Sequence, residues 1–118
     1  MQELTTTNDQ ERKVSAAAHL STLLGYLIPL ANIIAPLIIM LMKKQESAYI
    51  GYHAREALNF QISILFYVLI CIPFVFIGIG VIMLVAVAIF DLIMVIVATI
   101  KANDGESYRY PYTIRLIK

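Results

Sequence analysis

Residues 58–100 decide the fold of this chain, and they read LNFQISILFYVLICIPFVFIGIGVIMLVAVAIFDLIMVIVATI. This run contains no Lys or Arg, and its one acidic residue is Asp91. A bilayer core about 30 Å thick is crossed by about 20 apolar helical residues. The run is too long for a single crossing, so it predicts two membrane helices.

The break between these two helices is expected at Gly78 and Gly80 in the segment IGIG. Glycine lowers helix propensity and permits the backbone angles of a tight turn. We therefore expect one helix to end near Ile77 and the next to cover residues 81–100. Pro73 precedes the break and is expected to bend the first of these helices.

The overall composition agrees with a membrane protein. Of the 118 residues, 60% are apolar and 14% are charged, which lies far outside the usual balance of soluble domains. Disordered chains are polar and rich in charge, so disorder is excluded as well. The net charge of +1 leaves no basic footprint for nucleic acid. The single cysteine, Cys71, lies in an apolar run and is interpreted as a packing residue.

A second apolar block covers residues 14–42. As one helix it would measure about 43 Å, and as two helices each half would be short for a bilayer. Pro29 and Asn32 suggest a helix stop followed by an N-cap, which favours two helices.

Charge placement supports the same choice, because Lys and Arg are in excess on the cytoplasmic side of membrane proteins. With two hairpins every basic residue falls on one side, namely Arg12, Lys13, Lys43, Lys44, Arg55, Lys101, Arg109, Arg115 and Lys118. The predicted fold is therefore all-α and polytopic, with four transmembrane helices as two hairpins and both termini in the cytoplasm. The first hairpin is expected to be short or re-entrant.

Three segments follow from this topology. Residues 1–13 form a polar N-terminal segment, residues 14–101 the four-helix membrane domain, and residues 102–118 a cytoplasmic tail at the membrane interface. Within the membrane domain, Ser47 is a predicted N-cap of the helix that enters the 58–100 run.

Asp91 is the main candidate for an intramembrane polar site. It lies ten positions before Lys101, about 15 Å deep, where ionisable groups are costly and usually face the bundle interior. Folding back at the glycines predicts Tyr67 as its hydrogen-bonding partner. Three roles stay open: an interhelical hydrogen bond, a proton or ion relay, and a lipid-facing or interfacial position. His19 is expected to be a hydrogen-bonded interhelical residue, not close in depth to His53.

The segment HAREALNFQ, residues 53–61, is the most polar part of any predicted membrane helix. Its polar side chains form a stripe that either bonds within the bundle or binds a partner protein or a lipid headgroup. The candidate residues for this second role are His53, Arg55, Glu56, Asn59 and Gln61.

The chain has no phosphate-binding glycine loop, nucleophile elbow, HExxH pair or CxxC motif. The two histidines lack the spacing of a zinc site. We therefore expect no enzymatic activity, no metal site and no cofactor.

Three blocks carry a family resemblance: HLSTLLGYLIPLANIIAPLIIMLMKK at 19–44, HAREALNFQ at 53–61 and KANDGESYRYPYTIRLIK at 101–118. Over about residues 16–118 the chain resembles a bacterial domain-of-unknown-function family related to the twenty-kilodalton Tic subunit of the chloroplast import translocon. The resemblance implies a four-helix bundle in the bacterial cytoplasmic membrane whose polar block lies at residues 53–61. It implies no catalytic residues.

Three functions compete on this basis. The first is an accessory or scaffold subunit that interacts with other membrane proteins, in translocation or envelope maintenance. The second is an oligomeric channel or transporter that uses Asp91. The third is a protein that responds to anionic lipid through its basic residues. The expected partners are the lipid bilayer, other membrane proteins or further copies of the chain.

Overall fold

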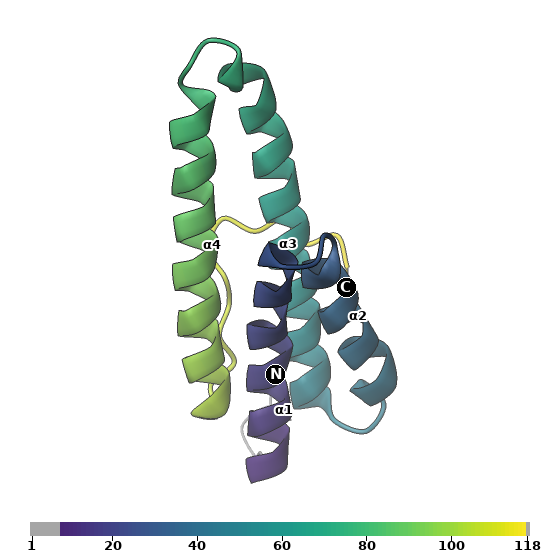
Figure 1. The fold of residues 1–118 in the computed structure, drawn as a ribbon. Coiled ribbons are helices and arrows are strands. Elements are labelled where there is room, and N and C mark those ends of the chain that lie inside the picture. Colours follow the sequence, from purple (N-terminus) through teal and green to yellow (C-terminus); the bar gives the residue numbers. More distant parts are fainter. Residues whose placement is uncertain (1–7, 118) are drawn as a thin grey trace.

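A computed structural model describes residues 8–117, and the regular structure within them is entirely helical. The elements are α1 (Asp9–Leu20), the 3₁₀ helix η2 (Ser21–Tyr26), α2 (Ala31–Lys43), α3 (Ala48–Val75) and α4 (Gly80–Asn103). In Figure 1, α3 and α4 form a long hairpin, and α1, η2 and α2 form a shorter one against its lower half. The prediction of an all-helical fold with four α-helices is confirmed.

Helix length separates the two hairpins. Helices α3 and α4, with 28 and 24 residues, are both long and apolar enough to cross a membrane, with lengths of about 42 and 36 Å. Helix α2 has 13 residues, which gives about 20 Å. Two of the four predicted spans therefore have the length of a crossing, and the first hairpin is short, as its turn at Pro29 suggested.

The connection between α3 and α4 follows the predicted glycine break. Gly78 has a φ of +89°, in the left-handed region that glycine adopts without a steric penalty. Gly80 begins α4, and a Cβ atom added there would lie 2.2 Å from the backbone nitrogen of Val75. Only glycine permits so close an approach of the two helix ends. Helix α3 continues through Pro73 to Val75.

The turn of the first hairpin differs from the prediction at Asn32. Leu30, with a φ of 69°, is the N-cap of α2 and gives the helix no side-chain hydrogen bond. The Asn32 side chain instead donates to Oε1 of Gln61 on α3, at 2.8 Å. Asn32 was wrong as an N-cap because a buried partner on another helix takes its amide.

Side-chain caps begin the other two helices of the lower half. The Asn8 side chain accepts a hydrogen bond from the backbone N–H of Glu11, and the Glu11 carboxylate accepts one from the backbone N–H of Asn8. Residues 9–13, part of the polar N-terminal segment of the sequence analysis, thus form the start of α1. Ser47 accepts from the backbone N–H of Ile50 and is the predicted cap of α3.

The core lies in the lower half, where the two hairpins meet. Small residues let the helices approach closely, as is common in membrane bundles. The alanines with no exposed surface are Ala18, Ala54, Ala57, Ala98 and Ala102. The larger core residues are Phe60, Ile64, Val95 and Tyr110, and the rings of Phe60 and Tyr110 stack with centroids 4.0 Å apart.

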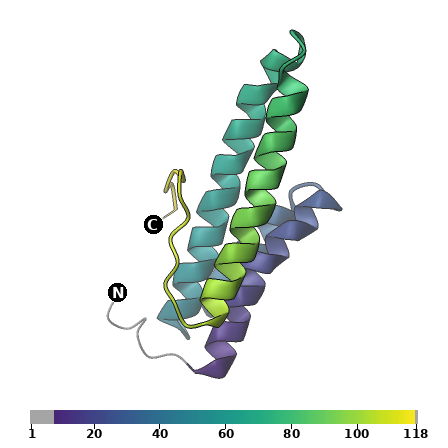
Figure 2. The same cartoon turned by 90° about the vertical axis from the view of Figure 1, so that its left-hand side faces the viewer.

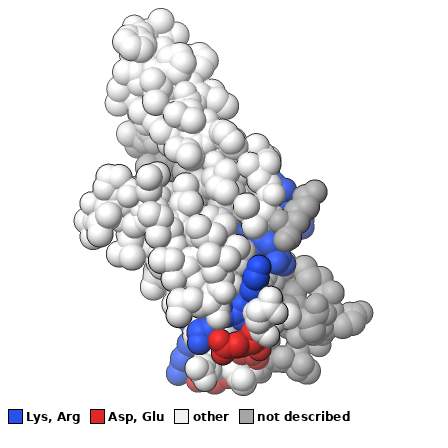
Figure 3. Space-filling view, turned by 90° about the vertical axis from the view of Figure 1, so that its right-hand side faces the viewer, with Lys and Arg blue, Asp and Glu red and all other residues white. Residues whose placement is uncertain are grey.

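The C-terminal tail follows α4 and runs back along the α3–α4 hairpin, as Figure 2 shows. Figure 3, seen from the opposite side, shows charged side chains gathered over the lower half of the molecule, while the upper part of this face is uncharged. At the upper end the side chains of Phe76 and Ile77 are 87% and 74% exposed. The molecule is therefore polar at one end and apolar at the other.

Candidate functional site: two buried polar networks

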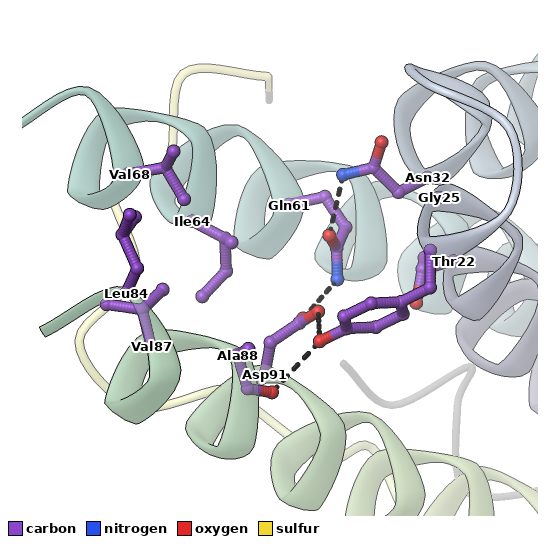
Figure 4. A pocket seen from close by; sticks show the side chains of 11 residues that line it. Thr22, Gly25, Asn32, Gln61, Ile64, Val68, Leu84, Val87, Ala88 and Asp91 are labelled. Carbon is purple, nitrogen blue, oxygen red and sulfur yellow. Dashed lines mark hydrogen bonds between the residues drawn. The ribbon is translucent and has the colours of Figure 1, made fainter. Parts of the chain in front are cut away.

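The first network joins both hairpins around Asp91. Its carboxylate accepts a hydrogen bond from the Gln61 amide at 2.6 Å and one from the Tyr26 hydroxyl at 2.9 Å. Gln61 in turn accepts from the Asn32 amide at 2.8 Å. Figure 4 shows the chain of bonds from Asn32 through Gln61 to Asp91. Each of η2, α2, α3 and α4 thus contributes one side chain.

A pocket of about 160 Å³ lies beside this network. Its polar residues include Thr22 and Asp91, and its apolar wall is formed by Ile64, Val68, Leu84 and Val87. Asp91 is 5% exposed. Both of its carboxylate oxygens accept hydrogen bonds, as a buried carboxyl group requires.

The predicted partner of Asp91 was Tyr67, and this was wrong. The Tyr67 hydroxyl donates to the backbone carbonyl of Tyr112 in the tail. Tyr67, Ser63 and Asn59 are spaced four residues apart and occupy the face of α3 that the tail covers. Gln61 lies on a different face of α3 and reaches Asp91. Tyr67 was predicted from its expected depth in the membrane alone, but the face of α3 on which a side chain lies determines whether it reaches Asp91.

The second network lies nearer the polar end and contains both histidines. His19 and His53 share a hydrogen bond of 2.8 Å between Nε2 and Nδ1, and Nδ1 of His19 is 2.8 Å from the hydroxyl of Tyr110. The prediction that His19 is an interhelical hydrogen-bonded residue agrees with this geometry. The expectation that it lies apart from His53 was wrong, because the first hairpin packs closely against α3 through alanines.

Tyr110 connects this network to the tail. Its hydroxyl reaches His19, and its backbone N–H donates to the carboxylate of Glu56 at 2.8 Å. Burial raises the pKa of the Tyr110 hydroxyl well above its usual value, so the phenol keeps its proton. Arg115 also donates to Glu56, and the two form an ion pair.

Asn59 and Ser63 hold the rest of the tail. The Asn59 amide donates to the carbonyl of Ile117 at 2.8 Å and accepts from its N–H at 2.9 Å. Ser63 accepts from the N–H of Ile114 at 2.7 Å. The tail, predicted to lie at the membrane interface, therefore pairs its backbone with polar side chains of α3.

The five candidate binding residues of the polar stripe thus have different surroundings. His53, Glu56, Asn59 and Gln61 are buried and bonded to other parts of the chain, whereas Arg55 keeps an accessible side chain. Sequence reasoning missed Tyr26, Asn32 and Tyr110 as members of the networks. Tyr26 and Asn32 were detectable as polar side chains on either side of a turn in an apolar block. Tyr110 gave no such signal.

No group of three His, Cys, Asp or Glu side chains within residues 8–117 could hold a metal ion. Cys71 is buried and unpaired in this part of the chain. The hydrogen bonds of the two networks link the hairpins and the tail, and the buried carboxyl groups of Asp91 and Glu56 both take part in such bonds.

A comparison with protein families gives a match over residues 10–117. No curated protein and no solved structure matches the chain. The family match supports a small bacterial membrane protein, and none of the comparisons supports the resemblance to the Tic subunit. Because the match covers nearly the whole chain, the protein belongs to the MamF/MmsF family, the magnetosome magnetite crystal formation protein family.

Proposed function

We propose that this protein is an accessory subunit of the magnetosome membrane that supports magnetite crystal formation by binding other membrane proteins. The family match supports the membrane and the process. The observation that carries the accessory role is the upper half of the α3–α4 hairpin, which rises past the first hairpin with apolar side chains on its surface (Figures 1 and 3). Further transmembrane segments could pack on this surface.

The proposal includes a topology. Helices α3 and α4 span the bilayer, the first hairpin enters from the cytoplasmic side without crossing fully, and both termini stay in the cytoplasm. The placement of Lys and Arg at the lower end supports this orientation, because cytoplasmic segments carry the excess of basic residues. We assign no catalytic activity to the chain.

The experiment is photo-crosslinking in magnetosome-forming cells. A photoreactive residue replaces Ile82, which is 70% exposed on α4, and a matched variant carries it at Tyr112, which is 80% exposed on the tail. We expect a reproducible membrane protein to be captured from position 82 and not from position 112. Capture of lipid alone from position 82 would contradict the accessory role.

A second candidate function is an oligomeric channel or transporter, favoured by the pocket beside Asp91. In this case Asp91→Asn would abolish ion flux through proteoliposomes while the protein still folds. Against it, hydrogen bonds inside one copy already occupy both carboxylate oxygens of Asp91. The flux measurement therefore separates the two candidates.

A further inference from the structure

A basic recess lies between α3 and the tail, beside the Glu56–Arg115 ion pair. Its volume is about 360 Å³. From α3 it is lined by residues that share one helix face, and from the tail by residues on both sides of the bend at Tyr112. These lining residues are Tyr52, Arg55, Glu56, Asn59, Arg109, Arg115 and Ile117.

The recess carries an excess of positive charge. Among the described residues that line it, Glu56 is the only acidic one, and its carboxylate is paired with Arg115. Arg55 and Arg109 form no ion pair with any acid among residues 8–117. The Nε atom of Arg115 is buried and lacks a hydrogen-bond partner in the same part of the chain. Within residues 8–117, two guanidinium groups without an acidic partner and one N–H without an acceptor therefore lie at the recess.

The other polar groups of the recess shape it and are not free to bind. Asn59 uses its amide on the backbone of Ile117, and the Tyr52 hydroxyl donates to the carbonyls of Ser107 and Tyr108. These bonds hold the tail beside α3, which brings Arg109 and Arg115 to the level of Arg55. The arginines come together only because the tail folds back.

Exposed apolar side chains neighbour the recess-lining residue Arg115 along the tail. Ile114 and Leu116, on either side of Arg115, are 45% and 56% exposed. A basic site next to exposed apolar side chains fits a ligand that has an anionic head and hydrocarbon chains. Guanidinium groups bind phosphate oxygens through paired hydrogen bonds.

We propose that this recess binds the phosphate group of an anionic phospholipid, with Arg55 and Arg109 as its contacts and the acyl chains along Ile114 and Leu116. A free phosphate ion offers the same oxygen atoms, so the test separates the two sources. This site does not depend on the accessory role, because a lipid site and a protein partner can each exist without the other.

The test uses the purified full-length protein in detergent micelles that contain phosphatidylcholine, to which phosphatidylglycerol or inorganic phosphate is added. Cys71 is buried, so its reaction with a thiol dye reports thermal unfolding. The double variant Arg55→Gln/Arg109→Gln removes the site. The matched control Lys13→Gln/Lys44→Gln removes the same charge from exposed positions outside the recess.

We expect phosphatidylglycerol to raise the unfolding temperature of the native protein and of the control. The concentration for half the effect should rise about 25-fold in the double variant, since each basic group contributes a factor of about five. If the half-effect concentration rises as much in the control as in the double variant, the proposal is overturned, because general charge attraction then explains the stabilisation. The proposal is also overturned if phosphatidylglycerol does not stabilise the native protein. The same holds if inorganic phosphate raises the unfolding temperature as much as phosphatidylglycerol does.

If the double variant does not fold in phosphatidylcholine, Arg109→Gln alone decides the matter, because Arg109 lies exposed on the tail and its loss leaves the core intact. The half-effect concentration should then rise about fivefold. An unchanged concentration in this variant would refute the site.

Discussion

The lower and upper halves of this molecule differ in where their polar and apolar side chains lie. In the lower half, five helical elements and the tail enclose buried polar side chains, and several of these bond to other elements, as Asp91 and Gln61 do. In the upper half, only α3 and α4 remain, and most of their large side chains are apolar and exposed, although Cys71 is buried. The lower half owes its stability to internal contacts, whereas the upper half depends on its surroundings.

The largest contrast is expected from two phenylalanines. Phe60 is fully buried and stacks on Tyr110, so Phe60→Ala should lower the free energy of unfolding by about 3 kcal/mol. Phe76 is 87% exposed at the upper end, so Phe76→Ala should leave it nearly unchanged. Unfolding in mixed micelles by added sodium dodecyl sulfate, followed by circular dichroism, measures both. A large effect of Phe76→Ala would mean that the upper half has internal packing of its own.

A smaller loss is expected when the first network is broken. Asp91→Ala leaves the Gln61 amide without its acceptor, while the Tyr26 hydroxyl keeps the backbone carbonyl of Ala88, and the change should cost about 1.5 kcal/mol. Asp91→Asn keeps one acceptor oxygen and should cost less. The same titration measures both variants, and equal losses would argue that the hydrogen bonds contribute little beside packing.

The hydrogen bond between Tyr110 of the tail and His19 of the first hairpin should contribute less to stability than the first network does. Tyr110→Phe keeps the stacked ring and removes the hydroxyl that reaches His19, so we expect a loss of about 1 kcal/mol. Tyr112→Phe, at an exposed position, is the matched control and should have no effect. Increased proteolysis of the tail in Tyr110→Phe would show that the bond also keeps the tail in place. Equal behaviour of the two variants would refute this link.

The smallest effect is expected at the exposed ion pair of α1. Lys13 lies 2.9 Å from Asp9, and its hydrogen bond holds the pKa of Asp9 below the usual value. Both groups are solvated, and such pairs contribute little to stability. Lys13→Gln should therefore not change the unfolding midpoint, and a clear shift would point to a contact with another molecule.

Local chemistry made part of this structure predictable. The turn at Gly78 and the cap at Ser47 depend on a few neighbouring residues, and both could be expected from the sequence. The hydrogen bond between His19 and His53 joins residues on different hairpins, and the one between His19 and Tyr110 spans most of the chain. Such pairs depend on how the hairpins pack and which face each helix turns inward, so spacing along the sequence did not reveal them.

Asp91 illustrates the same limit within the candidate site. Its depth and its cost in an apolar helix identified it as the central polar residue. Its partners could not be assigned by depth, because Tyr67 at the expected level faces the tail, and Gln61 faces α4. The sequence therefore predicted that Asp91 is a central polar residue, but it did not predict which side chains contact Asp91.

The folded-back tail has a consequence for biosynthesis. Glu56, Asn59 and Ser63 enter the membrane domain early, but their partners lie in residues 110–117, which leave the ribosome last among the described residues. A nascent chain that stops after α4 would leave Glu56 and Asn59 without these partners, while the Ser63 hydroxyl would keep its hydrogen bond to the backbone carbonyl of Asn59. The polar face of α3 is therefore fully bonded only after the tail has been synthesised and has folded back.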